Sequence, residues 1–430
     1  GVTGHSMGGR LTTLVAIDPR VEAAVPSVGG TGFLYQDFWG LPGSGRRMQE
    51  GRELYEATMG SEAYWPRIRC PVLFLGSSND FNAPADLIPR AMSLLPHPNR
   101  RLALAPHLNH RFTPDTTVAR TLWFEARLKK TFDFPQTPKA ALMLHQRDGI
   151  PRLKVFPDQR AKQKVKDVNI YYGYDRDPRV RFWRSAEVRK RGAGYEAPCP
   201  VFDLEEPLFA FANVTYALKK GVAIPYRNEP VEELTLSSDI QIAYPGRLKD
   251  NRVEATDEWE RLIDDFKHGD RDWYWLEKEN RHHWQLNTRK LCDPKWTGPK
   301  DAQLSFAIRS TRPTQLGVVL RANQWRNYNR RPRKTYVALI TLSGRGWERV
   351  PLSPGNFMSY TGEAPVLRDW ADVTELTFQP AKRAVERIRK ENRGAKITAS
   401  YEEWQGELPQ FKDVQWVGGS YTKRKKPYLP

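Results

Sequence analysis

The chain has 430 residues, a length that predicts two to three domains, and 39% of them are apolar before glycine is counted. No run approaches 18 apolar residues, and the three cysteines lie too far apart for a disulfide framework or a Cys-x-x-Cys metal site. The net charge of +18 raises nucleic acid as a partner, but the basic residues are scattered among acidic ones and no nucleic-acid-binding signature accompanies them. We therefore expect a globular chain with no membrane span, no nucleic-acid partner, no metal and no cofactor. The composition does not indicate an oligomeric state.

The first predicted elements surround a serine motif. Residues 4–8 read GHSMG, which fits the pattern G-x-S-x-G. Strand-like residues precede the motif, and a helical stretch follows from Met7 to about Ile17. In this pattern the serine occupies a strained turn between a strand and a helix, and the glycines let the backbone turn without clashes. Ser6 is therefore the candidate nucleophile, and the backbone N–H of Met7 is the candidate oxyanion-hole donor.

Alternating strands and helices follow the serine motif. Buried strands are predicted at 21–28, 71–76 and 101–105, and helices at 85–95 and 117–130. Asp80 comes soon after the second of these strands, at the edge where open α/β sheets collect ligands and catalytic groups. His107 and His110 follow the third strand.

Ser6, Asp80 and His110 stand in the chain order Ser–Asp–His, 74 and 30 residues apart. This is the order of a catalytic triad in α/β-hydrolases, where serine attacks, histidine moves the proton and the acid orients the imidazole. The alternatives are that Ser6 is a structural turn serine and that Asp80 caps the following helix.

Three motifs carry a resemblance to a known superfamily: GHSMGG at 4–9, CPVLFLG at 70–76 leading to Asp80, and Pro106 followed four residues later by His110. Residues 1–135 thereby resemble the second half of an α/β-hydrolase domain, closest to dienelactone hydrolase-like, acetyl xylan esterase-like and PhoPQ-activated pathogenicity-related proteins. The spacing from Pro106 favours His110 over His107 as the base. In this superfamily a second oxyanion donor lies upstream of the serine, so the resemblance implies a chain truncated at its N-terminus and, as it stands, poorly active.

An insertion at about 30–69 separates the first two downstream strands. Glycines followed by clustered aromatics favour a cap over the substrate pocket, with Phe38 and Trp39 as pocket residues. The alternative is that these two rings simply pack within the cap.

The remaining residues read as β-rich accessory domains. Short alternating segments at 152–156, 168–172, 180–183 and 208–216 predict an immunoglobulin- or fibronectin-like sandwich over 136–230. Residues 231–430 contain ten of the 14 tryptophans, and the stretches around Trp347 and Trp370 resemble jelly-roll carbohydrate-binding modules. Exposed tryptophans would stack on sugars; the alternative is that they fill the sandwich core.

The sequence thus predicts an α/β fold, a partial α/β-hydrolase sheet, followed by all-β sandwich or jelly-roll domains. The predicted function is a serine carboxylic ester hydrolase acting on a small-molecule or polysaccharide ester, with secretion or a periplasmic location expected. The alternatives are an inactive carbohydrate-binding scaffold and an oligopeptidase-type serine peptidase.

Overall fold

The structure is a computed structural model that describes residues 1–31, 52–225, 227–323, 334–359, 366–391 and 401–421. The chain divides into two compact units, Gly1–Thr256 and Asp257–Pro430. The predicted segments 1–135 and 136–230 both fall in the first unit. Within the described ranges, none of the helices has the length and apolar character needed to cross a membrane. The predicted pocket residues Phe38 and Trp39 lie outside the described residues.

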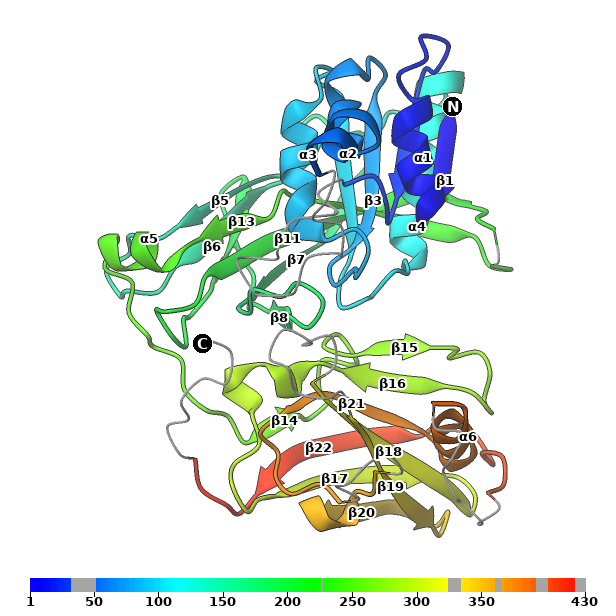
Figure 1. Cartoon of the computed structure of the whole chain (residues 1–430), viewed down its shortest axis with the longest axis vertical. Helices are drawn as coiled ribbons and strands as arrows, with labels where there is room; N and C mark the ends of the chain where they lie inside the picture. The colour runs from blue at the N-terminus through cyan, green and yellow to red at the C-terminus, as the bar shows by residue number, and fades with distance from the viewer. Residues whose placement is uncertain (32–51, 226, 324–333, 360–365, 392–400, 422–430) are drawn as a thin grey trace. The chain divides into compact units, whose positions relative to one another are not determined.

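The first unit begins with a parallel sheet of order β1-β2-β3-β4. Figure 1 shows helices α1 and α3 beside this sheet, with α4 on its other side. The strands are β1 (Val2–His5), β2 (Ala24–Ser27), β3 (Val72–Ser77) and β4 (Arg100–Ala105), and the helices are α1 (Met7–Val15), α2 (Arg52–Thr58), α3 (Ile88–Leu94) and α4 (Pro114–Phe124).

The two faces of the parallel sheet supply two different cores. Successive side chains of a strand point to opposite faces, so Leu73 faces α4 and packs with Trp123. Its neighbour Phe74 belongs to the core that contains Ile88 of α3. Strands buried on both faces are nearly continuous in apolar residues, and this is why β3 was recognisable in the sequence.

Two antiparallel sheets complete the first unit, with orders β5-β6-β10-β9 and β12-β11-β7-β8, and β13 pairing with β11. Their strands are β5 (Lys139–Met143), β6 (Arg152–Phe156), β7 (Val165–Gly173), β8 (Arg184–Ser185), β9 (Arg189–Arg191), β10 (Gly194–Pro198), β11 (Leu208–Val222), β12 (Val231–Ser237) and β13 (Gln241–Ala243), and α5 (Pro245–Asp250) follows them. Residues 180–183 are not a strand, because the amides of Val180 and Arg181 both donate to the carbonyl of Asp177 and form a turn.

The sheet β12-β11-β7-β8 packs against the parallel one. The Leu104 amide of β4 donates to Ser237 Oγ at 2.8 Å, and Asn213 Nδ2 donates to the Leu104 carbonyl at 3.1 Å. These side chains satisfy backbone groups at an edge strand that would otherwise invite pairing with another chain. Apolar residues of both kinds of sheet, such as Leu73 and Ala210, belong to one core.

The predicted α/β class is wrong for this chain. Only β1 to β4 pair in parallel, whereas β5 to β22 all lie in antiparallel sheets, so the described residues form a mainly antiparallel β protein. The prediction gave too much weight to the serine motif, whose parallel sheet has four short strands. Those strands share their core with the antiparallel sheets.

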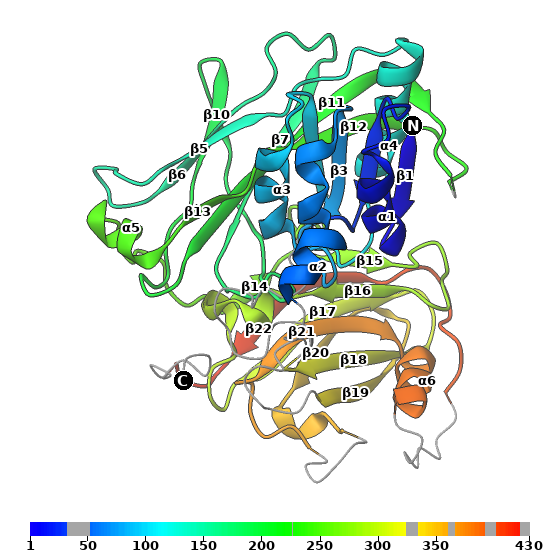
Figure 2. The ribbon, with the colours of Figure 1, turned by 45° about the horizontal axis from the view of Figure 1, so that its top comes forward.

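The second unit is a sandwich of two antiparallel sheets, β14-β22-β17-β20 and β15-β16-β21-β18-β19. Phe306 of the first sheet and Phe378 of the second meet with ring centroids 4.9 Å apart, and Figure 2 shows α6 beside β18 and β19. The elements are β14 (Leu262–Asp264), β15 (Tyr274–Leu276), β16 (Gln285–Thr288), β17 (Gln303–Ser310), β18 (Thr314–Ala322), β19 (Lys334–Leu342), β20 (Gly346–Leu352), β21 (Val373–Pro380), α6 (Ala381–Glu391) and β22 (Gln410–Val417).

Most described tryptophans of the second unit are buried. Trp370 is 1% exposed, its Nε1 donates to the Ala302 carbonyl at 2.9 Å, and its ring lies 4.8 Å from that of Trp416. Trp347 differs: it is 43% exposed, and the ammonium of Lys412 lies 4.3 Å from its ring centroid. The core explanation therefore holds for Trp370, and sugar stacking stays a prediction for exposed rings such as Trp347.

Replacing Trp370 with alanine should destabilise the protein by about 4 kcal/mol, because it removes a large buried ring and leaves a cavity. The matched change Trp347→Ala should cost about 0.5 kcal/mol or less, as is usual at the surface. Guanidinium unfolding of the full chain, followed by tryptophan fluorescence and circular dichroism, would measure both. Equal losses from the two changes would contradict the assignment of Trp370 to the core.

Candidate active site

The site begins at the turn between β1 and α1. Ser6 occupies this turn with φ 62° and ψ −115°, a conformation that costs energy for any residue except glycine. Two close approaches fix it. A Cβ added to Gly4 would lie 2.4 Å from the Gly8 carbonyl oxygen, so helix and strand meet there backbone to backbone. The Ser6 amide also donates to the Ser27 carbonyl at 2.9 Å.

The N-terminus of α1 lies directly after Ser6. The first amides of a helix have no acceptor within the helix, and here they belong to Met7, Gly8 and Gly9. Their partial positive charge favours an anion near the serine. Met7 as a whole is 74% exposed.

Asp80 lies in the loop after β3, and its side chain is fully buried. Its Oδ1 accepts hydrogen bonds from the backbone amides of Asn82, at 2.6 Å, and Ala83, at 2.7 Å. Its Oδ2 lies 2.9 Å from His110 Nδ1. One carboxylate oxygen is thus held by the local backbone while the other faces the histidine. A neutral His110 ring in this position carries its proton on Nδ1 and presents Nε2 as a base.

His110 lies between two other rings. The His5 ring approaches it edge-on at 5.0 Å, and the Phe81 ring lies at 4.9 Å. Partial burial and the neighbouring His110 lower the pKa of His5. Because His5 directly precedes Ser6, its contact with His110 places the histidine loop near the serine turn. The sequence did not predict this contact, since nothing in the spacing of His5 indicates which loop returns to it.

His107 takes a different position. Its side chain is buried and stacks on Phe182 at 5.4 Å, and its amide donates to Ser78 Oγ at 2.8 Å. The structure therefore brings His110 to Asp80, while the ring of His107 packs on Phe182.

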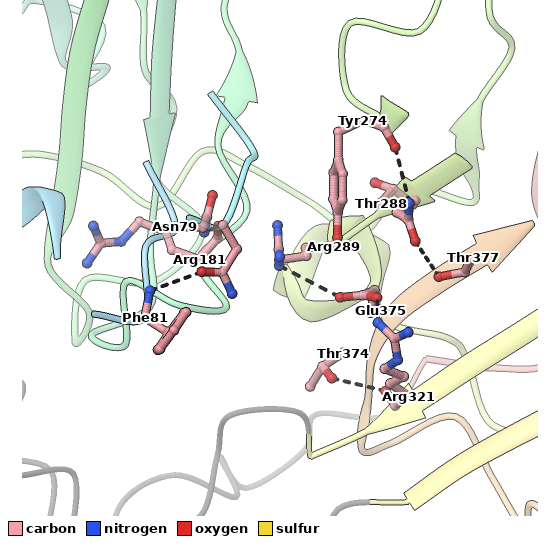
Figure 3. Close-up of polar contacts among 12 residues, drawn as sticks. Asn79, Phe81, Arg181, Tyr274, Thr288, Arg289, Arg321, Thr374, Glu375 and Thr377 are labelled. Carbon is pink, nitrogen blue, oxygen red and sulfur yellow. Dashed lines mark hydrogen bonds and ion pairs between the residues drawn. The ribbon is translucent and has the colours of Figure 1, made fainter. Parts of the chain in front are cut away.

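Sequence reasoning missed the residues that hold the Asp80 loop. Asn79 Nδ2 donates to the carbonyls of Pro178 at 2.8 Å and Arg181 at 2.7 Å, and Figure 3 shows Asn79 and Arg181 together. The Arg181 guanidinium forms two hydrogen bonds to Asp86, at 2.7 and 2.9 Å. These partners lie about a hundred residues away in sequence, and no local pattern signals such a pairing.

A second polar cluster lies in the second unit. Glu375 accepts a hydrogen bond from the Arg321 guanidinium and lies 3.9 Å from Arg289 Nε, as Figure 3 shows. Thr377 Oγ1 donates to Asn287 Oδ1 at 2.8 Å. These contacts link β16, β18 and β21 and include no nucleophile with a base beside it. We therefore assign the cluster a role in holding the strands together.

Comparison with known proteins adds little. No protein-family model matches the chain, and no curated protein is similar to it in sequence. A solved structure, the tandem N-terminal CBM22 modules of Xyn10C from Paenibacillus barcinonensis, aligns with 66% of this chain and 92% of its own. The identity is 10% and the TM-score is 0.21, which does not establish a shared fold.

Proposed function

We propose that this protein is a serine hydrolase that cleaves carboxylic esters. Ser6 is the nucleophile, His110 the general base and Asp80 the group that orients His110. The observation that carries the proposal is the 2.9 Å contact between Asp80 Oδ2 and His110 Nδ1, together with the strained serine turn beside the same histidine loop. A buried acid whose second oxygen is fixed by two amides has the geometry that orients an imidazole for proton transfer.

The proposed mechanism gives each of these residues one role. Ser6 Oγ attacks the ester carbonyl carbon while His110 Nε2 takes the hydroxyl proton, and Asp80 stabilises the imidazolium that forms. The carbonyl oxygen becomes an oxyanion and accepts a hydrogen bond from the backbone N–H of Met7. Collapse of this intermediate expels the alcohol, which receives the proton from His110. Water activated by His110 then hydrolyses the acyl-serine, releases the acid and restores Ser6.

An ester is favoured over an amide because an alcohol leaves more readily than an amine. The test is a panel of p-nitrophenyl esters of increasing acyl length, acetylated xylan and aminoacyl p-nitroanilides, with the full chain and with Ser6→Ala. We expect hydrolysis of short-chain esters that depends on Ser6, with little cleavage of the anilides. Preference for the anilides would indicate a peptidase instead. Equal ester turnover by both proteins would overturn the proposal.

A further inference from the structure

We propose that the 175–183 segment, which joins β7 to β8 in the antiparallel part of the first unit, is a positioning element of the active site. It holds the Asp80 loop through Asn79 and through Asp86, so that Asp80 presents one oxygen to His110. This inference rests on the proposed function, in which Asp80 orients the base. Asn79 and Arg181 are the two positioning residues.

The first attachment is the Asn79 side chain, which is fully buried. Its side-chain amide donates hydrogen bonds to the carbonyls of Pro178 and Arg181. Its Oδ1 accepts a hydrogen bond of 2.9 Å from the Ser78 hydroxyl. Its own backbone amide donates to the Leu108 carbonyl at 3.1 Å. One residue therefore ties together the acid loop, the histidine loop and the 175–183 segment. An amide is required here, because carboxylate or aliphatic side chains lack the two donors.

The second attachment is the ion pair of Arg181 with Asp86, whose side chains are 0% and 2% exposed. Asp86 lies in the 3-10 turn Ala85–Leu87, where the acid loop enters α3. The Arg181 guanidinium also lies 3.4 Å from the centroid of the Phe209 ring of β11. Breaking such a pair by removing one partner leaves a buried, uncompensated charge, so the pair constrains both segments to one arrangement.

The two attachments enclose the catalytic acid. Asn79 directly precedes Asp80, and Asp86 follows Asp80 six residues later in the sequence. Between them lie the amides of Asn82 and Ala83, which bind the other carboxylate oxygen of Asp80. Fixing both ends of this loop fixes the direction of Oδ2 toward His110. Displacements of about 1 Å in such a group cost on the order of 10²-fold in rate.

The 175–183 segment is itself held in shape. Asp177 is fully buried and accepts two hydrogen bonds from the Arg179 guanidinium, at 2.8 and 2.6 Å. Arg181 Nε donates to the Asp175 carbonyl at 2.9 Å. Trp183 packs its ring edge-on against Phe211 of β11 at 4.8 Å. The segment therefore offers the acid loop a preorganised surface.

The experiment compares Asn79→Ala and the double variant Arg181→Met/Asp86→Asn with a matched control, Asn213→Ala, in the full chain. Asn213 also bridges the two kinds of sheet with a buried amide, but it binds the Leu104 carbonyl of β4 and not the acid loop. The double variant removes both charges, so that no lone buried ion remains to unfold the protein. Thermal melts establish that each variant is folded.

Two readouts separate positioning from stability. The first is ester kinetics: Asn79→Ala and the double variant should lower kcat by about 10- to 100-fold with KM nearly unchanged, whereas Asn213→Ala should lower the melting temperature and leave kcat intact. The second is the low-field proton resonance of the Nδ1–H of His110, assigned by its loss in Asp80→Asn. It should disappear or exchange rapidly in the first two variants and persist in the control.

The outcomes distinguish this inference from the proposed function. If wild type and Ser6→Ala hydrolyse esters equally, the proposed function is wrong, and the resonance still tests the positioning. Unchanged kcat and an unchanged resonance in Asn79→Ala and in the double variant would overturn the inference. The inference would also be overturned if Asn213→Ala lost kcat and the resonance to the same extent, or if the wild type lacked the resonance.

Discussion

Ser6→Ala should abolish labelling of the full chain by a fluorophosphonate probe and lower kcat for ester hydrolysis by about 10⁶-fold. Removing the nucleophile of a serine triad costs about this much, since the remaining groups then act without a covalent intermediate. The thermal melt should change little, because alanine retains the Cβ in the turn that holds Ser6 at φ 62°. Labelling is read by in-gel fluorescence and kcat by p-nitrophenolate release.

The control for this prediction is Ser93→Ala. Ser93 is an exposed serine on α3 whose hydroxyl donates to the Arg90 carbonyl, so its loss should leave labelling unchanged. Labelling that persists in Ser6→Ala would show that another group reacts with the probe. A loss of only ten- to a hundredfold in kcat would also contradict the nucleophile assignment, because that size is typical of a supporting group.

His110→Gln should also lower kcat by about 10⁶-fold, since the serine hydroxyl is a weak nucleophile unless a base beside it takes its proton. Glutamine fills a similar volume and carries no charge, so the fold should survive. The comparison is His107→Phe, which preserves the stacking of an aromatic ring on Phe182. Steady-state kinetics and melts of both variants decide the matter.

We expect His107→Phe to leave kcat nearly unchanged, because the His107 ring stacks on Phe182 of the 175–183 segment and phenylalanine can keep that contact. If His107→Phe proved inactive while folded, and His110→Gln kept its activity, the base would have been assigned to the wrong ring. The 2.9 Å geometry at Asp80 would then have no role in turnover.

Local patterns were enough to predict several individual strands and helices of the first unit, though not its fold class. The strand before Asp80 was recognisable because burial on both faces makes β3 continuously apolar. The helix after Ser6 was recognisable because the glycines of the serine motif and the following residues mark a strand-to-helix turn. The segment 180–183 was wrongly predicted as a strand, because its alternating residues pack in a turn closed by hydrogen bonds to the Asp177 carbonyl.

The fold class was not predictable from the motif. The stretch from Ser6 to His110 spans about a quarter of the chain. Its motif does not predict which strands cover the sheet that carries these residues. The strands that cover it, β11 and β12, pair in antiparallel fashion, and their Asn213 and Ser237 side chains bond the backbone of β4. Which strands meet across such a distance depends on shape and on satisfied backbone groups, which no local spacing encodes.

The sequence by itself determined the residue types of the candidate site and their order: Ser6 in a glycine-flanked turn, Asp80 after a buried strand, His110 after the next. The spacing from Pro106 favoured His110 as the base, but only the tertiary structure showed that His110 meets Asp80, that His5 contacts His110, and that Arg181 holds the acid loop through Asp86. The physical reason is the separation along the sequence over which each kind of interaction acts. Strand and turn preferences act between residues a few positions apart, whereas hydrogen bonds and ion pairs between segments form only after the chain has brought distant residues together.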